Sequence, residues 1–281
     1  MPYTAEISRA NPSCFLFLID QSGSMADAWG GGQDGIAGSK ALEVATIVNN
    51  LLRNIVLKCS KDEGVRNYFD VGVIGYGSHV GPAFGGTLAG RDLVAVADLA
   101  DAPLRIEDRT RKVMDGAGGV LDTTVKFPVW FDPVSFGGTP MRAAFAEALR
   151  VLRPWIESHP ASYPPIVFHI TDGESTDGDP SQDAGDLRRL GTQDGPVMLF
   201  NIHVSSQPEQ EISFPAMPPG LPDAYATMLF DMSSDLPSEM RERLQMEGYA
   251  APAGARGFIF NAEPTALVNF LDIGTRPANL R

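Results

Sequence analysis

The sequence predicts an α/β protein with a doubly wound, mainly parallel sheet, helices on both faces and one antiparallel edge strand. Strand-like and helical segments alternate along most of the chain, which is typical of parallel sheets. The strand-like segments are continuous apolar runs, which indicates that both of their faces are buried. In addition, 43% of the 281 residues are hydrophobic, enough for a large core.

Each element of the first half follows from a local pattern. The first strand is expected at 13–20, where "SCFLFLID" is a continuous apolar run. A long helix should follow at 38–58, because this segment carries one broad apolar stripe and offers Ser39 as an N-cap. A second strand is expected at 68–77, with a hairpin partner at 80–86.

The second half continues the alternation. A helix should begin after the "GGTP" turn at 137–140, and a strand should lie within 163–176, ending in "ITDGEST". The remaining predicted elements are a helix at 183–190, strands at 196–204 and 255–261, and a closing helix at 264–274.

Two regions are additions to this alternation of strands and helices. Residues 87–132 mix short helical stretches with turns and contain "TTVKFPVWF", which alternates like a strand. Proline inside a strand is tolerated at a sheet edge, so we expect an edge strand there and interpret the region as an insertion packed onto the main domain. Residues 214–250 contain a proline-rich loop and two short helices, a C-terminal helical elaboration. We expect residues 1–281 to form a single domain.

Charge and composition restrict the classes of partner and compartment. The net charge is −13, which opposes binding to nucleic acid or to an anionic membrane surface. The sequence has no apolar run of the roughly 20 residues that span a bilayer. Its N-terminal segment lacks the pattern of a signal peptide. We expect Cys14 and Cys59 to be free, buried thiols and the chain to be cytoplasmic.

Oxygen-bearing side chains gather where predicted strands end and one helix begins. Asp20, Ser22 and Ser24 follow the first strand, Thr139 lies in the "GGTP" turn, and Asp172 follows a later strand. Because open parallel sheets bind ligands at the carboxyl ends of their strands, we expect these side chains to meet at one edge. All five are hard oxygen ligands, which favours Mg²⁺, with Mn²⁺ or Ca²⁺ as alternatives.

This set of motifs resembles the metal-ion-dependent adhesion site of von Willebrand factor type A (vWA) domains. The match consists of D-x-S-x-S, a threonine before a helix, and a strand that ends in T-D-G. The resemblance implies a vWA or Rossmann-like fold in which Ser22, Ser24 and Thr139 ligate a metal ion. Asp20 and Asp172 would act directly or through water. An acidic residue of a partner protein would fill the open position on the metal.

The chain looks like the intracellular bacterial branch of this family, because it lacks the export signal and paired cysteines of extracellular relatives. Some members of that branch are similar to tellurium-resistance-associated proteins, and these are often encoded beside a PP2C-type phosphatase and a serine/threonine kinase. The resemblance therefore implies a protein-interaction module of a bacterial stress-response or signalling assembly, with these two enzymes among its candidate partners.

Two alternatives stay open at this point. A phosphohydrolase could use the same ion as a Lewis acid. Against it, no His or Lys lies in 20–25, 137–141 or 171–175 to act as a base, and no catalytic residue is expected. A metal-free scaffold, in which the hydroxyl groups only cap helices and turns, would explain each motif singly but not their common order.

The other polar residues have structural interpretations. We expect an acidic, solvated rim around the site, formed by Asp27, Asp34, Glu174, Asp177 and Asp179. His169 and His203 lie inside apolar segments and away from the predicted carboxyl tips of their strands. We therefore expect both to be core histidines bonded to neighbouring groups.

Overall fold

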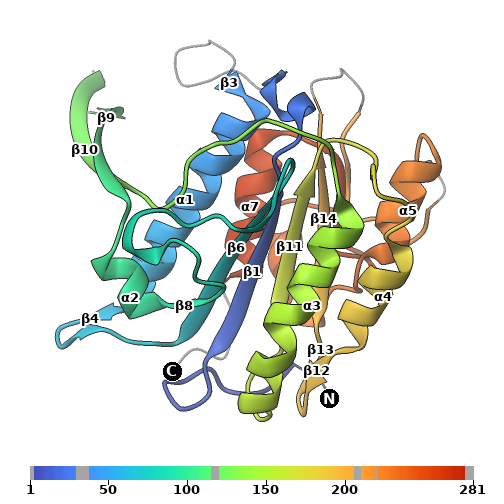
Figure 1. The fold of residues 1–281 in the computed structure, drawn as a ribbon, viewed down its shortest axis with the longest axis horizontal. Coiled ribbons are helices and arrows are strands. Elements are labelled where there is room, and N and C mark those ends of the chain that lie inside the picture. Colours follow the sequence, from blue (N-terminus) through green and yellow to red (C-terminus); the bar gives the residue numbers. More distant parts are fainter. Residues whose placement is uncertain (1–2, 30–37, 115–119, 206–209, 219, 276–281) are drawn as a thin grey trace.

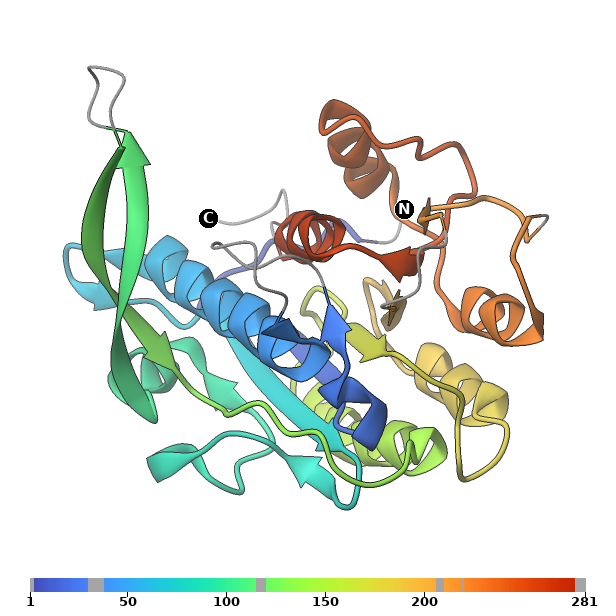
Figure 2. The ribbon, with the colours of Figure 1, turned by 90° about the horizontal axis from the view of Figure 1, so that it is seen from above.

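The computed structural model describes residues 3–29, 38–114, 120–205, 210–218 and 220–275. These residues form three layers, with a central sheet between two layers of helices (Figures 1 and 2). Within the described ranges, no helix is both long and apolar enough to cross a membrane.

Five parallel strands form the centre of the sheet. They are β1 (Ser13–Asp20), β6 (Phe69–Tyr76), β11 (Ile166–Thr171), β14 (Met198–Val204) and β16 (Phe258–Ala262). Their order in space is β6-β1-β11-β14-β16. The antiparallel strands at the edges are β7 (Val80–Pro82), β8 (Val94–Ala95) and β15 (Ile212–Ser213). The predicted fold class is confirmed, but antiparallel strands lie at both edges rather than at one.

Helices cover both faces of this sheet. One layer contains α1 (Lys40–Cys59) and α7 (Pro264–Gly274), with α6 (Ser238–Met246) packed against α7. The other contains α3 (Met141–Ser158), α4 (Ser181–Arg189) and α5 (Ala224–Met232). Along β1, Phe15 and Phe17 pack into the α1 layer, whereas Leu16 and Leu18 pack into the α3 layer. Burial on both faces explains the continuous apolar run of this strand.

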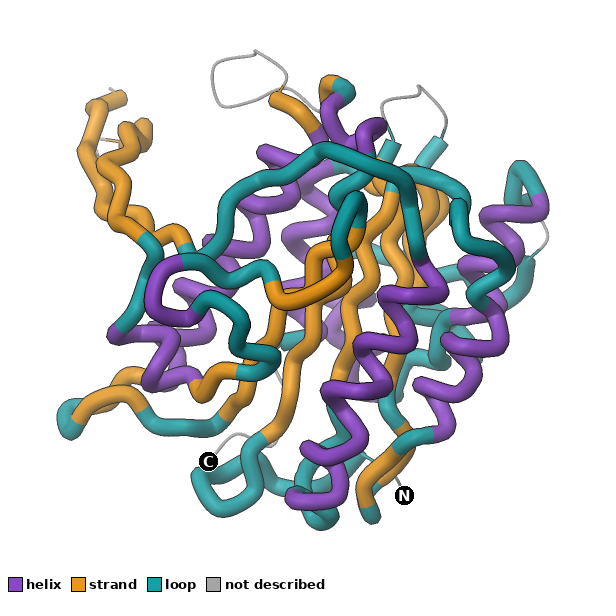
Figure 3. The backbone as a smooth tube through the Cα atoms, in the orientation of Figure 1, coloured by secondary structure: helices purple, strands orange, loops and turns teal. Residues whose placement is uncertain are grey.

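The order of the parallel strands reverses between β1 and β11. The chain leaves β1 through α1 and adds β6 on one side, and it later adds β11 on the other side. The carboxyl ends of β1 and β11 therefore lie at the switch point where open α/β sheets bind ligands. In Figure 3 the loops that follow these strands gather at the upper edge of the sheet.

The region 87–132 contains more strand than the sequence suggested. β9 (Arg105–Met114) and β10 (Val120–Val129) form an antiparallel hairpin that is separate from the main sheet and projects beside α1 (Figures 1 and 2). The edge-strand prediction needs this correction: β10 pairs with β9, not with the main sheet. β9 supplies the hydrogen-bonding partner of β10, and its Glu107 forms ion pairs with both Arg105 and Arg109, which gives the hairpin a charged face.

Other parts of the insertion join the main body. β8 pairs with β6, and α2 (Val96–Asp101) packs against α1. Three further pairs of short antiparallel strands lie outside the main sheet. They are β2 (Ala28–Trp29) with β3 (Gly38–Ser39), β4 (Ser60–Lys61) with β5 (Gly64–Val65), and β12 (Gly191–Thr192) with β13 (Gly195–Pro196).

Several local predictions are confirmed. The Ser39 hydroxyl accepts a hydrogen bond of 3.2 Å from the Leu42 amide and caps α1. Two short helices, α5 and α6, follow the proline-rich loop as expected. Cys14 and Cys59 are free and buried, and burial raises the pKa of both thiols.

A buried histidine ties the central strands together. On β11, the His169 Nδ1–H donates to Asn201 Oδ1 of β14 at 2.8 Å, and Nε2 accepts from the Tyr76 hydroxyl of β6 at 2.7 Å. Asn201 in turn donates to the Ser233 hydroxyl at 2.9 Å. The prediction of a core histidine bonded to neighbours is confirmed for His169. These bonds link β11, whose end carries part of the candidate site, to β6 and to β14.

We predict that His169 makes the stability depend on pH. Burial lowers its pKa to about 4, from 6.5, so the imidazole is neutral in the folded state, whereas the unfolded chain takes up a proton below about pH 6.5. The unfolded state then binds more protons, so the free energy of unfolding falls as the pH drops from about 6.5 to 4, by on the order of 3 kcal/mol from this group.

Urea denaturation at a series of pH values checks this prediction. His169→Gln should reduce the slope without abolishing it, because burial lowers the pKa of His203 to about 4 as well. The matched control is His79→Gln, at an exposed position, which should keep the wild-type slope. Equal slopes for the two variants would contradict the prediction.

Candidate metal-binding site

Asp20 is a fully buried carboxylate at the last position of β1. Its side chain accepts hydrogen bonds of 2.8 Å from the Ser22 amide and of 2.8 Å from the Thr171 hydroxyl of β11. Burial raises the pKa of Asp20 to about 6, although the bonds to Ser22 and Thr171 oppose the shift. The nearby Asp172 carboxylate raises it further. Asp20 therefore fixes the loop after β1 and gives the site a negative charge at neutral pH.

Two serine hydroxyls and a second carboxylate meet beside Asp20. Ser24 Oγ donates to Asp172 Oδ1 at 2.8 Å, and Ser22 Oγ lies 3.1 Å from Ser24 Oγ and 3.5 Å from Asp172 Oδ1. The Asp172 side chain has no exposed area. Three of the five predicted ligands thus contact one another across the carboxyl ends of β1 and β11.

Backbone hydrogen bonds bring the "GGTP" turn to the same edge. The Gly23 amide donates to the Gly137 carbonyl at 3.0 Å, which joins the turn to the loop after β1. Thr139 and Thr176 exchange two bonds of 2.9 Å, which join the turn to the loop after β11. Gly137 has φ +103°, and a Cβ there would collide with the backbone of Ser78. Only glycine satisfies both conditions at this position.

The remaining hydroxyl faces the same space. A Cβ atom placed on Gly173 would lie 3.9 Å from Thr139 Oγ and 4.0 Å from Ser24 Oγ, so these two oxygens border one small volume. Within the described residues, no three His, Cys, Asp or Glu side chains cluster in the manner of a metal site. A metal ion at this edge would therefore depend on hydroxyl ligands as well as on two carboxylates, and that donor set suits Mg²⁺, Mn²⁺ or Ca²⁺.

A buried lysine, which sequence analysis did not place here, completes the cluster. Lys40 is the first residue of α1, and its Nζ lies 2.8 Å from Asp172 Oδ2. The Lys40 side chain is only 5% exposed, and its Nζ also lies 3.6 Å from the carboxylate of Asp27. The motif segments themselves contain no lysine, but the fold brings Lys40 to them from the following helix.

His203 lies closer to the site than the sequence suggested. β14 ends at Val204, so His203 lies at the carboxyl tip of its strand, level with Thr171 of β11. Its Nδ1 accepts from the Asn261 amide at 3.2 Å, and its ring stacks on Phe260. Burial lowers its pKa to about 4, which keeps the ring neutral. The prediction that His203 lies away from the strand tip was wrong. The prediction that it is buried and bonded to a neighbouring group is confirmed.

The expected acidic rim is partly present. Asp27 is 62% exposed, and Glu174 and Asp179 are also exposed beside the loop after β11. Asp177 is exposed too, but it accepts bonds of 3.0 Å from two amides of the first turn of α3. It therefore has a structural task as well. Asp34 lies outside the described residues.

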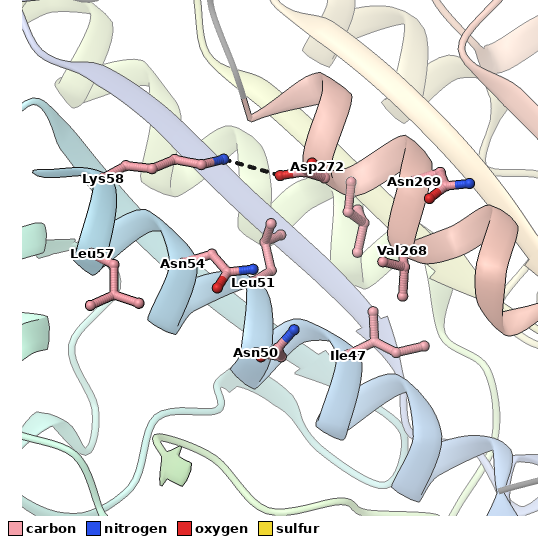
Figure 4. A pocket seen from close by; sticks show the side chains of 10 residues that line it. Ile47, Asn50, Leu51, Asn54, Leu57, Lys58, Val268, Asn269 and Asp272 are labelled. Atoms are coloured by element: carbon pink, nitrogen blue, oxygen red, sulfur yellow. Dashed lines mark hydrogen bonds and ion pairs between the residues drawn. The ribbon is translucent and has the colours of Figure 1, made fainter. Parts of the chain in front are cut away.

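A separate groove lies between α1 and α7. Its volume is about 330 Å³, and Ile47, Leu51 and Val268 contribute its apolar lining. The ion pair of Lys58 with Asp272, at 3.0 Å, crosses it (Figure 4). None of the five predicted metal ligands lines this groove, so it is independent of the candidate site.

Comparisons with known proteins give only weak structural likeness. No protein-family model and no curated protein sequence matches the chain. One similar solved structure is the ArnB paralog VWA2 from Sulfolobus acidocaldarius, with a TM-score of 0.34 and 14% identity over 72% of this chain and 37% of that one. Another is the vWF domain of the type V pili tip protein Mfa5 from Porphyromonas gingivalis, with a TM-score of 0.31 and 14% identity over 59% and 39%.

A third similar structure is the adhesive tip pilin GBS104 from Group B Streptococcus agalactiae. Its TM-score is 0.30, with 14% identity over 87% of this chain and 72% of that one. The match spans well under half the length of VWA2 and of Mfa5. At these scores the likeness supports no inference about the site or the function.

We predict that the Thr171 hydroxyl contributes to stability through Asp20. Thr171→Val keeps the shape of the side chain but removes the bond to a buried carboxylate, which should lower the free energy of unfolding by about 2 kcal/mol. The control is Thr275→Val, which removes a 2.8 Å bond to the neutral Leu271 carbonyl and should cost about 1 kcal/mol. Urea denaturation at pH 8, where Asp20 is ionised, measures both. A larger cost for the Thr275 variant would contradict the prediction.

Proposed function

We propose that the chain is a vWA-type protein-interaction module that holds a divalent metal ion, Mg²⁺ in the first instance, and binds an acidic residue of a partner through it. The observation that carries the proposal is the cluster of Ser22, Ser24 and Asp172 at the switch point of the sheet. The Thr139 hydroxyl borders the same small volume. This is the set of oxygens that the sequence motifs single out.

The chemistry of the cluster supports a hard cation. Ser22, Ser24 and Thr139 would be the hydroxyl ligands, and Asp20 and Asp172 would act directly or through water. When bound, the ion would supply a positive centre, because the hydroxyl ligands add no negative charge to that of the two carboxylates. Both oxygens of Asp20 already accept a hydrogen bond, yet each keeps a second lone pair. Metal binding is therefore compatible with the contacts that hold the loop.

The surroundings of the cluster support a protein partner. Phe136 is 72% exposed, and its backbone is bonded to Gln21 and Ser78 of the neighbouring loops, so an apolar side chain is available beside the proposed metal position. A hollow of about 280 Å³, lined in part by Glu174 and Tyr225, lies next to the loop after β11. An aromatic contact beside a charged anchor is typical of strong interface positions.

The acidic rim should make partner binding depend strongly on the proposed metal ion. Asp27 and Glu174 would repel a partner's carboxylate unless a cation intervened. We extend the proposal to a cytoplasmic bacterial stress-response or signalling assembly, with a PP2C-type phosphatase or a serine/threonine kinase as the partner. This extension depends on the family resemblance of the motifs alone.

We predict that divalent metal ions stabilise the metal-stripped protein. At 100 times the dissociation constant, a bound ligand adds about 2.7 kcal/mol, which should raise the unfolding midpoint by about 5 °C in a chain of this size. Differential scanning fluorimetry against Mg²⁺, Mn²⁺ and Ca²⁺ measures this shift. Ser24→Ala and Thr139→Ala should each weaken it.

A matched hydroxyl provides the control for this experiment. Ser175 donates to Asp177 at 2.8 Å on the loop after β11 and belongs to no ligand position. Ser175→Ala should therefore keep the wild-type metal response. A metal response that survives both ligand variants would place the ion elsewhere and contradict the proposal.

We also predict that partner binding needs the metal and a partner carboxylate. Purified candidate partners should bind the immobilised chain with Mg²⁺, be released by EDTA, and bind Ser24→Ala poorly. Replacing the contacting Asp or Glu of the partner by Asn or Gln should have the same effect. Surface plasmon resonance measures the affinities. Binding that persists in EDTA would instead favour the metal-free scaffold. Metal-dependent hydrolysis of p-nitrophenyl phosphate would favour the phosphohydrolase.

A further inference from the structure

Lys40 is a buried cation in contact with one of the proposed metal ligands. Its ammonium lies 2.8 Å from Asp172 Oδ2, while Asp172 Oδ1 accepts the Ser24 hydroxyl at 2.8 Å. One carboxylate therefore faces a lysine on one oxygen and the serine hydroxyls on the other. Both charged side chains are almost completely buried.

The lysine occupies an unfavourable place within its own helix. Lys40 is the first residue of α1, where the helix dipole disfavours positive charge and the free amides attract anions. Its ammonium is also removed from water, which is costly without a counter-charge. The contact with Asp172 supplies that counter-charge. The position of the ammonium is therefore explained by the candidate site and not by the helix.

We propose that Lys40 is an internal cation that competes with the divalent ion for Asp172 and thereby sets the metal affinity of the site. This inference rests on the proposed metal-binding function. Without metal, the lysine neutralises a buried carboxylate and holds the cluster together. A metal ion on the serine side would repel the ammonium across this carboxylate and would have to displace it, so binding is weaker than the five ligands alone would give.

The structure contains a second acceptor for the ammonium. Asp27 lies 3.6 Å from Lys40 Nζ and is 62% exposed, and its carbonyl accepts the Lys40 amide at 2.9 Å. This backbone bond keeps Asp27 beside the lysine. When a metal ion takes Asp172, the ammonium turns toward Asp27 at the solvent-exposed rim. The site thus has two states, one for each cation on Asp172.

The decisive variant is Lys40→Gln in the full chain. Removing the competing charge should raise the affinity for Mg²⁺ and Mn²⁺ by about tenfold or more, within the range of typical coupling between two sites. Isothermal titration calorimetry with the metal chloride measures the affinity, and circular dichroism checks the fold. Lys40→Arg keeps the charge and should stay near the wild-type affinity.

The matched control is Lys58→Gln. Lys58 lies on the same helix and pairs with Asp272 at 3.0 Å, so the variant removes an equal charge and an ion pair away from the site. Its metal affinity should equal that of the wild type. An equal gain for the Lys40 and Lys58 variants would reduce the effect to overall charge and overturn the inference.

A second variant keeps the inference testable if Lys40→Gln does not fold. Asp27→Asn changes an exposed residue, removes the alternative acceptor and should weaken metal binding several-fold. Glu174→Gln removes the same charge from another exposed residue of the rim, so it corrects for the general loss of negative charge. Equal effects of these two variants would overturn the inference.

The outcomes separate this inference from the proposed function. A wild type that binds metal through Ser24 and Thr139, with an unchanged affinity in Lys40→Gln, would overturn the competition and leave the metal site intact. Tight binding in Lys40→Gln with weak binding in the wild type would support the competition. If neither protein binds any metal, both the metal site and the competition are wrong.

Discussion

The constraint on which this edge of the molecule depends is the burial of two carboxylates at the ends of neighbouring parallel strands. β1 and β11 are paired so that Ile19 lies opposite Ile170, which places Asp20 level with Thr171 and next to Asp172. A buried charge without partners would cost several kcal/mol, so each carboxylate needs its own compensation. Asp20 obtains it from an amide and the Thr171 hydroxyl, and Asp172 obtains it from Lys40 and Ser24.

Hydrogen bonds that do not involve the carboxylates join the three loops around the cluster. The bonds between Gly23 and Gly137 and between Thr139 and Thr176 hold the loops independently of the acidic groups. Core packing on both faces of β1 then fixes the strand from which the first loop starts. Loops held in this way need little rearrangement to receive a ligand, so the change that the proposed metal requires is confined to the Lys40 side chain.

The sequence predicted the parallel sheet well because fully buried strands are continuous apolar runs. It placed Asp20, Ser22, Ser24 and Asp172 at one edge because they follow strand ends, and Thr139 because it precedes a helix, while their role as metal ligands stays a prediction. It did not reveal the β9–β10 hairpin, whose alternating charges resemble a solvated surface. The places of Thr171 and His203 at the site depend on strand register and on exact strand ends, which local sequence patterns do not specify. Lys40 did carry a signal: a lysine at the first position of a helix opposes the helix dipole and therefore calls for a nearby carboxylate.

The proposed roles of the metal and the lysine together imply reciprocal coupling with the partner. Asp20 and Asp172 carry two negative charges, and Lys40 cancels one of them, so the cluster alone attracts a divalent ion weakly. A partner's carboxylate would add the missing negative charge and would itself be repelled by the rim without the metal. Each ligand then raises the affinity for the other by the same factor, as linkage requires. A site of this composition would bind the metal and the partner together more tightly than it binds either one alone.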